Sequence, residues 1–423
     1  LVIITDNRNP LKTLPWIIVL VLAPVVGLVF YFFFGQNLSK QRIISRRMRK
    51  RITLQLEEAE HAAGPEIPKA YRPLARLLRT TSHAVPLYGS RITPYTDGSS
   101  KMEALLGEIA RARHHIHLQY YIFCDDETGR RLRDALVEKA RQGVHVRILY
   151  DDVGCSGVSK SFFEGMRREG IEVHAFLHVK FPRFTSKVNY RNHRKIVVID
   201  GRVGFIGGMN IADRYVHGTE WGSWRDTHFR IEGSGVAGLQ VAFLSDWSAT
   251  TKRHVSGSEY FPAAQRYTDN ILQIVAGGPL GKWRALLQAD SYAVANARRR
   301  VWIQTPYYLP SDVLNTALQT AALGGIDVRL MLPARSDSRL IDLASHSYLD
   351  DMMRAGVKIL FYEPGFLHSK LLIIDDGLTV IGSANMDFRS FEHNFEVNAF
   401  VYDAEFTSRM SAIFSDDAAR CHA

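Results

Sequence analysis

The sequence predicts an α/β protein of two similar halves, preceded by a membrane-spanning helix. Three observations predict this: an internal duplication, strand-like segments that alternate with helical ones in each copy, and a long charge-free apolar run near the N-terminus. The 423 residues suffice for two or three domains with buried cores. The formal net charge of +10 favours an anionic partner, either acidic lipid or nucleic acid.

The apolar run covers residues 14–34, none of which is charged. Its 21 residues would form a helix of roughly 31 Å, which matches the hydrocarbon core of a bilayer. Pro24 is expected to kink this helix, as spanning helices tolerate. Residues 1–5 begin with apolar side chains and are a candidate for the end of an earlier span. We therefore predict a membrane anchor over residues 1–39.

Charge is distributed unevenly around the predicted span. Only two basic residues, Arg8 and Lys12, precede it. A basic cluster follows it, formed by Lys40, Arg42, Arg46, Arg47, Arg49, Lys50 and Arg51. The positive-inside rule then predicts that the rest of the chain lies in the cytoplasm. The basic juxtamembrane segment, residues 40–80, is either a contact for anionic headgroups or a plain topology signal, and the two interpretations are compatible.

The duplication predicts the architecture of the remaining chain. Strand-like runs recur in the same order, at residues 116–122, 143–149 and 170–173 and again at 301–307, 325–331 and 356–359. Helical stretches separate them, so each copy is expected to form an α-β-α sandwich. We divide the chain into a first half, residues 81–256, and a second half, residues 257–423. Two such halves can pack about a pseudo-twofold axis with one site at the seam.

The copies agree best in one motif, His-x-Lys-x-x-x-x-Asp. Its members are His193, Lys195 and Asp200 in the first half and His368, Lys370 and Asp375 in the second. His and Lys two residues apart point to the same side of a strand. Each motif continues into an apolar strand and a turn of small residues that ends at Asn210 or Asn385.

This set of side chains suits a phosphate. One neutral histidine can attack phosphorus while the other donates and later accepts a proton. The lysines can neutralise charge on the non-bridging oxygens, and the Asn210 and Asn385 amides can donate hydrogen bonds. The sequence contains no cluster with metal-ligand spacing, so we expect neither a metal nor another cofactor.

At these residues the chain resembles the phospholipase D superfamily, whose hallmark is the duplicated motif. The resemblance implies two phospholipase D-like domains and a metal-independent phosphohistidine mechanism. It implies that Asp226 and Glu396 orient the histidines. Ser383 matches the serine that usually helps to bind phosphate, and Gly208 takes its place in the first copy. Asp200 and Asp375 belong to the catalytic motif but are expected to act as structural brackets.

The likeness is closest to bacterial cardiolipin synthases, in residues 190–195, 207–213, 304–308 and 365–370. It implies that one phosphatidylglycerol gives a phosphatidyl-enzyme and glycerol, and that a second phosphatidylglycerol then forms cardiolipin. By analogy with other members, His193 is the nucleophile and His368 the acid and base. The implied partners are these anionic phospholipids in the bacterial inner membrane, with the catalytic domains on the cytoplasmic side.

Other interpretations remain open at this point. A phospholipase would use the same residues with water as the acceptor. A membrane-tethered nuclease fits the net charge, but no interleaved aromatic and basic module is present, so nucleic acid is not an expected partner. A non-catalytic scaffold is disfavoured because both motifs are intact. The sequence predicts no oligomeric state.

Overall fold

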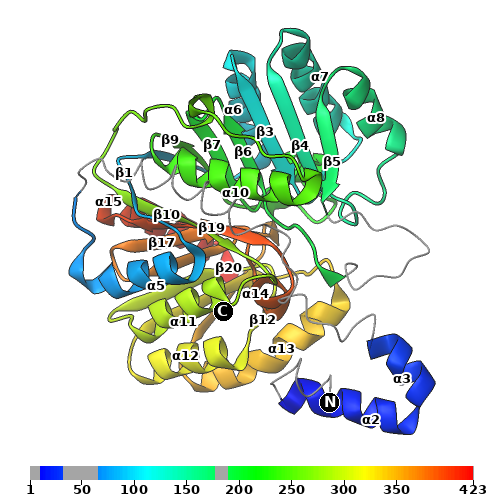
Figure 1. Cartoon of the computed structure of the whole chain (residues 1–423). Helices are drawn as coiled ribbons and strands as arrows, with labels where there is room; N and C mark the ends of the chain where they lie inside the picture. The colour runs from blue at the N-terminus through cyan, green and yellow to red at the C-terminus, as the bar shows by residue number, and fades with distance from the viewer. Residues whose placement is uncertain (1–9, 32–64, 177–188, 423) are drawn as a thin grey trace.

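The computed structural model describes residues 10–31, 65–176 and 189–422. The apolar residues 1–5, the basic cluster after the apolar run and most of a basic, aromatic insertion at residues 178–189 lie outside this part. The body consists of two sheets stacked one above the other, with helices on their outer faces (Figure 1). The two stacked layers correspond to the two halves of the duplication.

The first sheet has seven strands, and its parallel section lies at one end. In spatial order they are β2 (Arg91–Tyr95), β9 (His228–Glu232), β7 (Val203–Gly207), β6 (Ile196–Ile199), β3 (His115–Tyr120), β4 (His145–Asp151) and β5 (Glu172–Phe176). Three helices contribute to the core on its outer face: α6 (Gly98–Arg111), α7 (Glu127–Arg141) and α8 (Lys160–Arg168). β3, β4 and β5 are parallel neighbours, as expected when helices connect successive strands.

The second sheet repeats this order and adds one strand at each edge. Its strands are β1 (Leu87–Tyr88), β10 (Ile271–Gly277), β19 (Glu396–Tyr402), β17 (Leu378–Gly382), β16 (Leu371–Ile374), β11 (Arg300–Gln304), β13 (Asp327–Pro333), β14 (Lys358–Tyr362) and β20 (Cys421–His422). Its outer core includes α5 (Arg72–Ser82), α11 (Ala285–Ala295), α12 (Asp312–Leu323) and α13 (Arg339–Arg354). The predicted duplication of a mixed α/β unit is therefore confirmed.

The N-terminal part of the body packs on the second half. α5 contributes Leu74, Ala75 and Leu78 to the outer core of the second sheet. β1 pairs with β10, although the division at residue 81 assigned it to the first half. The chain thus crosses to the first sheet only after β1, and this crossing ties the halves together.

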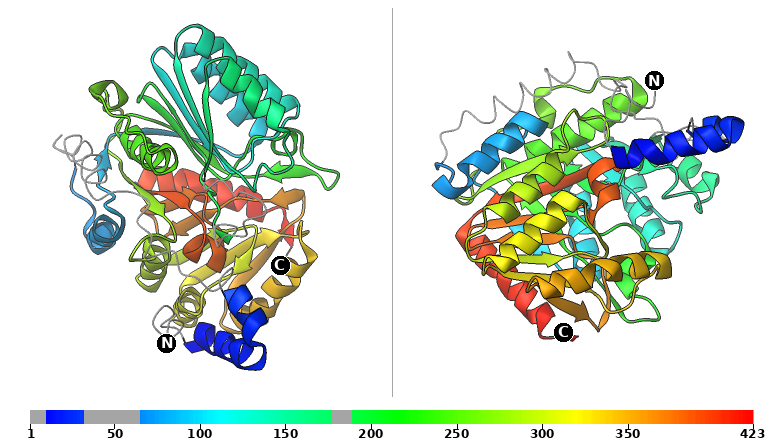
Figure 2. Two further views of the ribbon diagram at one scale, coloured as in Figure 1. Left: turned by 45° about the vertical axis from the view of Figure 1, so that its right-hand side comes forward. Right: turned by 90° about the horizontal axis from the view of Figure 1, so that it is seen from below.

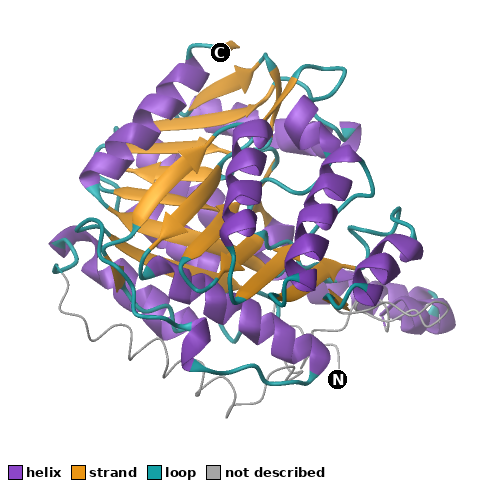
Figure 3. Ribbon diagram, turned by 90° about the horizontal axis from the view of Figure 1, so that it is seen from above, coloured by secondary structure: helices purple, strands orange, loops and turns teal. Residues whose placement is uncertain are grey.

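Apolar side chains fill the space between the sheets. One continuous core joins residues of both, among them Ile196 and Phe229 from the first and Leu371 and Val397 from the second. α10 (Gly235–Thr251) and α15 (Ala404–Ala418) also contribute to it. Seen from above, the strands run through the interior and the helices surround them (Figure 3). Because both faces are covered, the motif strands β6 and β16 are wholly apolar rather than alternating.

Short elements complete the described chain around these layers. They are η3 (Lys69–Tyr71), α9 (Asp213–His217), β8 (Ser223–Arg225), η5 (Ser258–Tyr260), β12 (Tyr308–Leu309), β15 (Gly365–Leu367), β18 (Met386–Asp387) and α14 (Phe388–Glu392). Several of them border the seam between the halves, where loops and short strands, rather than core strands, meet.

The N-terminal apolar run differs from the predicted single helix. It forms α2 (Pro10–Leu22) and α3 (Pro24–Phe30), which project from the body (Figure 2). The break lies at Ala23, because Pro24 lacks an N–H and disfavours helical geometry in the residue before it. The Trp16 and Tyr31 rings then approach to 5.5 Å, so the chain turns back instead of only bending. None of the helices that the structure describes is long and apolar enough to cross a membrane.

Candidate active site

The two motif histidines open on one pocket at the seam between the halves. His193 precedes β6 and His368 precedes β16, and both line a cavity of about 720 Å³. Asn210 and Asn385, at the ends of the turns after β7 and β17, line the same cavity. Sequence elements from distant parts of the chain therefore meet as predicted. The shared pocket is the geometric condition for two imidazoles to act on one phosphate.

Backbone hydrogen bonds across the seam hold each histidine in place. The N–H of His193 donates to the carbonyl oxygen of Phe395 at 2.9 Å, and the N–H of His368 donates to that of Arg225 at 2.7 Å. β8 and β15 also pair in parallel, which joins the two halves beside His368. Phe395 directly precedes Glu396, and Arg225 directly precedes Asp226. The backbone bonds therefore bring each histidine close to a carboxylate of the other half.

The carboxylates contact the histidines across the seam. His193 Nδ1 lies 3.0 Å from Oε1 of Glu396, and His368 Nδ1 lies 2.6 Å from Oδ2 of Asp226. The predicted pair of orienting carboxylates thus lies at the histidines. The order of residues in the chain did not reveal that each one serves the histidine of the opposite half.

The contacts of His193 define which of its ring nitrogens carries the proton. His193 Nδ1 also lies 3.0 Å from the carbonyl oxygen of Ser383. Both neighbours only accept hydrogen bonds, so Nδ1 carries the proton and Nε2 keeps its lone pair. Burial lowers the pKa of His193. Burial and then Lys370 lower the pKa of His368 to about 3. Both rings are therefore neutral at pH 7.

The carboxylates remain ionised although they are buried. Burial alone would raise the pKa of Asp226, but Lys370 and His368 outweigh it and lower the pKa. Burial likewise opposes ionisation of Glu396, and His193 and Lys195 outweigh it. A charged carboxylate behind each ring can then stabilise an imidazolium when one forms.

The two lysines lie under the histidines and do not line the cavity. Lys195 Nζ donates to the backbone oxygen of His193 at 2.5 Å, and Lys370 Nζ donates to that of His368. Burial lowers the pKa of Lys195 to about 7 and that of Lys370 to about 8. A phosphate anion in the cavity would favour their charged forms.

Asp200 and Asp375 do not belong to the site, although they complete the motif. Both occupy left-handed turns, at φ 53° and 52°. The Asp200 carboxylate accepts from the backbone N–H groups of residues 113, 114 and 115 at 2.8–2.9 Å. Asp375 accepts from those of residues 298, 299 and 300. The motif strand carries each aspartate to its far end, where its carboxylate holds a neighbouring turn and does not line the cavity.

Ser383 supports Glu396 instead of reaching the cavity. Its hydroxyl donates to Oε2 of Glu396 and accepts from the N–H of Val397 at 3.0 Å. Its role as a phosphate ligand stays a prediction, because in this structure the hydroxyl is directed at Glu396. Gly208 occupies the matching place in the first half, where a Cβ would lie 2.1 Å from Oδ1 of Asp226. Only glycine leaves room there for that carboxylate.

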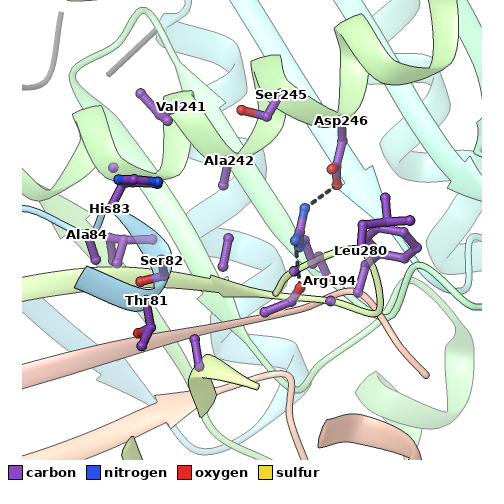
Figure 4. A pocket seen from close by; sticks show the side chains of 18 of the residues that line it. Thr81, Ser82, His83, Ala84, Arg194, Val241, Ala242, Ser245, Asp246 and Leu280 are labelled. Atoms are coloured by element: carbon purple, nitrogen blue, oxygen red, sulfur yellow. Dashed lines mark hydrogen bonds and ion pairs between the residues drawn. The ribbon is translucent and has the colours of Figure 1, made fainter. Parts of the chain in front are cut away.

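The residue between His and Lys faces away from the cavity, as the strand alternation predicts. Arg194 donates to Oδ2 of Asp246 at 2.5 Å, to the backbone oxygen of Glu396 at 3.0 Å and to that of Gly277 at 2.8 Å. Figure 4 shows this Arg194–Asp246 pair at the rim of a small pocket behind the motif. Arg194 thereby fixes the start of β19, where Glu396 lies.

Sequence reasoning missed the cationic wall of the cavity. Its lining includes Arg191, Arg214 and Arg389, together with Tyr121 and Trp224. A signal for two of the arginines was present: Arg214 and Arg389 each follow the turn asparagine by four residues. This repeated arginine lies outside the His-x-Lys-x-x-x-x-Asp motif.

Comparison with known proteins shows to which family the chain belongs. The model described as "Cardiolipin synthase, PLD-like domain" matches residues 105–225 and 292–418, which is more than half of the chain. The chain belongs to the phospholipase D-like cardiolipin synthase family. A second model, "Phospholipase_D-nuclease N-terminal", matches residues 1–36, the segment predicted as an anchor.

Relatives of this cardiolipin synthase family match over nearly the whole chain. "Cardiolipin synthase 2" of Bacillus cereus is 43% identical, with 98% of this chain and 82% of that protein covered. "Cardiolipin synthase" of Geobacillus thermodenitrificans is 42% identical, with 98% and 84% covered. The solved phosphatidylserine synthase of Haemophilus influenzae has a TM-score of 0.63 at 14% identity, covering 83% of this chain and 92% of that one. This last likeness concerns the fold alone.

Proposed function

We propose that the protein is a cardiolipin synthase that transfers a phosphatidyl group between two phosphatidylglycerol molecules through a phosphohistidine. One observation carries the proposal: two neutral histidines, each held by a carboxylate of the opposite half, open on a single cavity. Family membership and the relatives' names support the same phosphatidyltransferase activity.

In the first step His193 is the nucleophile. Two acceptors at Nδ1 leave the Nε2 lone pair free to attack phosphorus. A P–N bond forms and the P–O bond to the terminal glycerol breaks. His368 gives a proton to the departing oxygen. Burial and then Lys370 lower the pKa of His368, but a bound phosphate anion offsets the Lys370 charge.

In the second step the phosphatidyl group moves to the acceptor. The terminal hydroxyl of a second phosphatidylglycerol attacks phosphorus while neutral His368 takes its proton. The P–O bond of cardiolipin forms and the P–N bond to His193 breaks, which restores the enzyme. Lys195, Lys370 and the two asparagines stabilise the extra charge on the phosphoryl oxygens in both steps.

We place the enzyme at the bacterial inner membrane with its catalytic halves on the cytoplasmic side. Residues 14–34 contain no charge, and Leu14, Leu22, Val25 and Leu28 are exposed in α2 and α3. The basic cluster that follows suits anionic headgroups and predicts this orientation. Protection of the body from external protease in intact right-side-out membrane vesicles would support it, and cleavage would contradict it.

The activity is tested with purified full-length protein in vesicles of phosphatidylglycerol labelled in the terminal glycerol and in one acyl chain. A synthase releases one glycerol for each cardiolipin formed. A hydrolase releases glycerol with phosphatidic acid and no cardiolipin. Appearance of phosphatidic acid as the sole lipid product would overturn the synthase assignment in favour of the hydrolase.

A further inference from the structure

The cavity carries three guanidinium groups that the two-histidine mechanism does not use. Arg191, Arg214 and Arg389 all line it, in addition to the two buried lysines beneath its floor. Two carboxylates also line the cavity, but Asp337 accepts from the Tyr307 hydroxyl, and Asp387 accepts from the Asn385 amide and the N–H of Ser390. Cations that no carboxylate pairs with favour the binding of an anion. Reaction at one phosphate already uses the lysines, so the arginines call for another explanation.

The duplication makes two of these arginines equivalent and leaves the third unmatched. Arg214 and Arg389 occupy corresponding positions, each four residues after Asn210 or Asn385. Arg191 lies two residues before His193, where the second copy has Phe366 before His368. The cavity is therefore not symmetric, and the two histidines differ in their surroundings.

The wall beside His368 is aromatic. The rings of Trp224 and Phe366 lie 5.3 Å and 5.7 Å from the His368 ring. Arg214 lies over the Trp224 ring at 5.5 Å and over the Tyr215 ring at the same distance. The Arg214 guanidinium is therefore already stabilised by the Trp224 and Tyr215 rings.

The wall beside His193 holds two cations from different halves. Tyr121, whose ring lies 4.9 Å from that of His193, experiences the charges of both Arg191 and Arg389. Burial and the nearby Arg389 charge lower the pKa of Arg191, and Asp151 opposes this. Asp151 itself accepts from the N–H groups of Asn192 and Gly154. Within the part of the chain that the structure describes, neither arginine forms an ion pair with a carboxylate.

We propose that Arg191 and Arg389 form a second anion site, which binds the phosphodiester of the acceptor lipid while its terminal hydroxyl reaches the phosphohistidine. This inference rests on the proposed function. The acceptor is itself an anion, and in the product its phosphate is joined to the transferred one by a single glycerol. Two phosphates must therefore lie close together, and their repulsion requires cations beyond the motif lysines.

Arginine suits this task because its planar fork binds phosphate oxygens in pairs. Water carries no phosphate, so the second site assists transfer to lipid and not hydrolysis. The site thus determines which acceptor is used after the phosphatidyl-enzyme has formed. A synthase with this site favours cardiolipin over phosphatidic acid even though water is abundant.

The test compares full-length wild type, Arg191→Gln and Arg389→Gln in the doubly labelled vesicles. The measured quantity is cardiolipin formed per glycerol released. We expect this ratio to fall at least tenfold in each variant, with phosphatidic acid taking up the difference and the KM for acceptor lipid rising. Arg389→Lys is expected to recover part of the ratio. The exposed Arg335, which lies outside the cavity lining, supplies the matched control Arg335→Gln.

Two results would overturn the inference. One is a normal ratio in both glutamine variants. The other is a fall in glycerol release that equals the fall in cardiolipin, since the arginines would then serve the donor phosphate. Both leave the proposed function intact, because wild type would still make cardiolipin. Failure of wild type to make cardiolipin would instead refute the proposed function, so the two failures are distinct.

Discussion

His193 Nδ1 lies 3.0 Å from Oε1 of Glu396, a residue of the opposite half, and His368 pairs with Asp226 in the same crossed manner at 2.6 Å. Neither half alone contains a histidine together with its carboxylate. The seam is therefore part of the chemistry and not only a packing surface.

Replacing the crossed carboxylate should impair turnover more than binding. Glu396→Gln removes the charge that stabilises the His193 imidazolium and lets an amide N–H face Nδ1, which disfavours the productive tautomer. We expect kcat to fall by about 10²–10⁴-fold, with KM nearly unchanged, in initial-rate assays on vesicles. The exposed Glu405 at the start of α15 supplies the control Glu405→Gln. A loss confined to KM would contradict this role.

Turnover should require a glycine at position 208, because a larger side chain would displace the Asp226 carboxylate. Gly208→Ala places a methyl group 2.1 Å from Oδ1 of Asp226, so the carboxylate must move away from His368. Turnover should fall by about 10²-fold or more. Gly107→Ala, where the nearest atom to a new Cβ is 3.7 Å away, should leave the rate unchanged. Equal rates for both variants would show that Asp226 need not occupy its observed position.

The motif aspartates should affect stability and not turnover. Asp200→Ala leaves three backbone N–H groups without their acceptor and puts alanine at φ 53°. We expect the free energy of unfolding to fall by about 2–3 kcal/mol, measured by urea denaturation. Asp200→Asn should cost less, since asparagine tolerates this φ and keeps one oxygen. A large loss of kcat in the folded Asp200→Asn protein would restore a catalytic role.

Anion binding should weaken as pH rises through the lysine range. Burial lowers the pKa of Lys195 to about 7 and that of Lys370 to about 8, so both ammonium groups are charged below pH 7 and neutral above pH 8. Sulfate keeps its charge over this range and serves as a phosphate mimic. Its inhibition constant should rise between pH 6.5 and 9, and binding at pH 8 should take up protons in calorimetry. Binding that is constant with pH would contradict the lowered pKa values.

The sequence predicted the features that depend on local pattern and on the duplication, such as the directions of the motif side chains. Strand alternation sends His193 and Lys195 to one side and Arg194 to the other, and the structure agrees. The pairing of Glu396 with His193 depends on how two distant segments cross at the seam, which no local pattern encodes. Ser383 resembled a phosphate ligand because the motif does not specify the direction of its hydroxyl.

The N-terminal run shows a different limit of sequence reasoning. Apolar length alone predicted one helix, and composition does not distinguish a kink at Pro24 from a reversal. The break at Ala23 depends on local backbone geometry and on the contact between Trp16 and Tyr31. The cationic wall of Arg191 and Arg389 was missed for a related reason, since it forms only when both halves fold.

Direct identification of the covalent intermediate tests the central claim most sharply. Wild-type enzyme would be mixed with phosphorus-labelled phosphatidylglycerol, quenched at steady state, and digested for peptide mapping by mass spectrometry. We expect an acid-labile phosphatidyl adduct on the peptide that contains His193, and none in His193→Asn. An adduct on His368, or cardiolipin formation by His193→Asn at the wild-type rate, would contradict it.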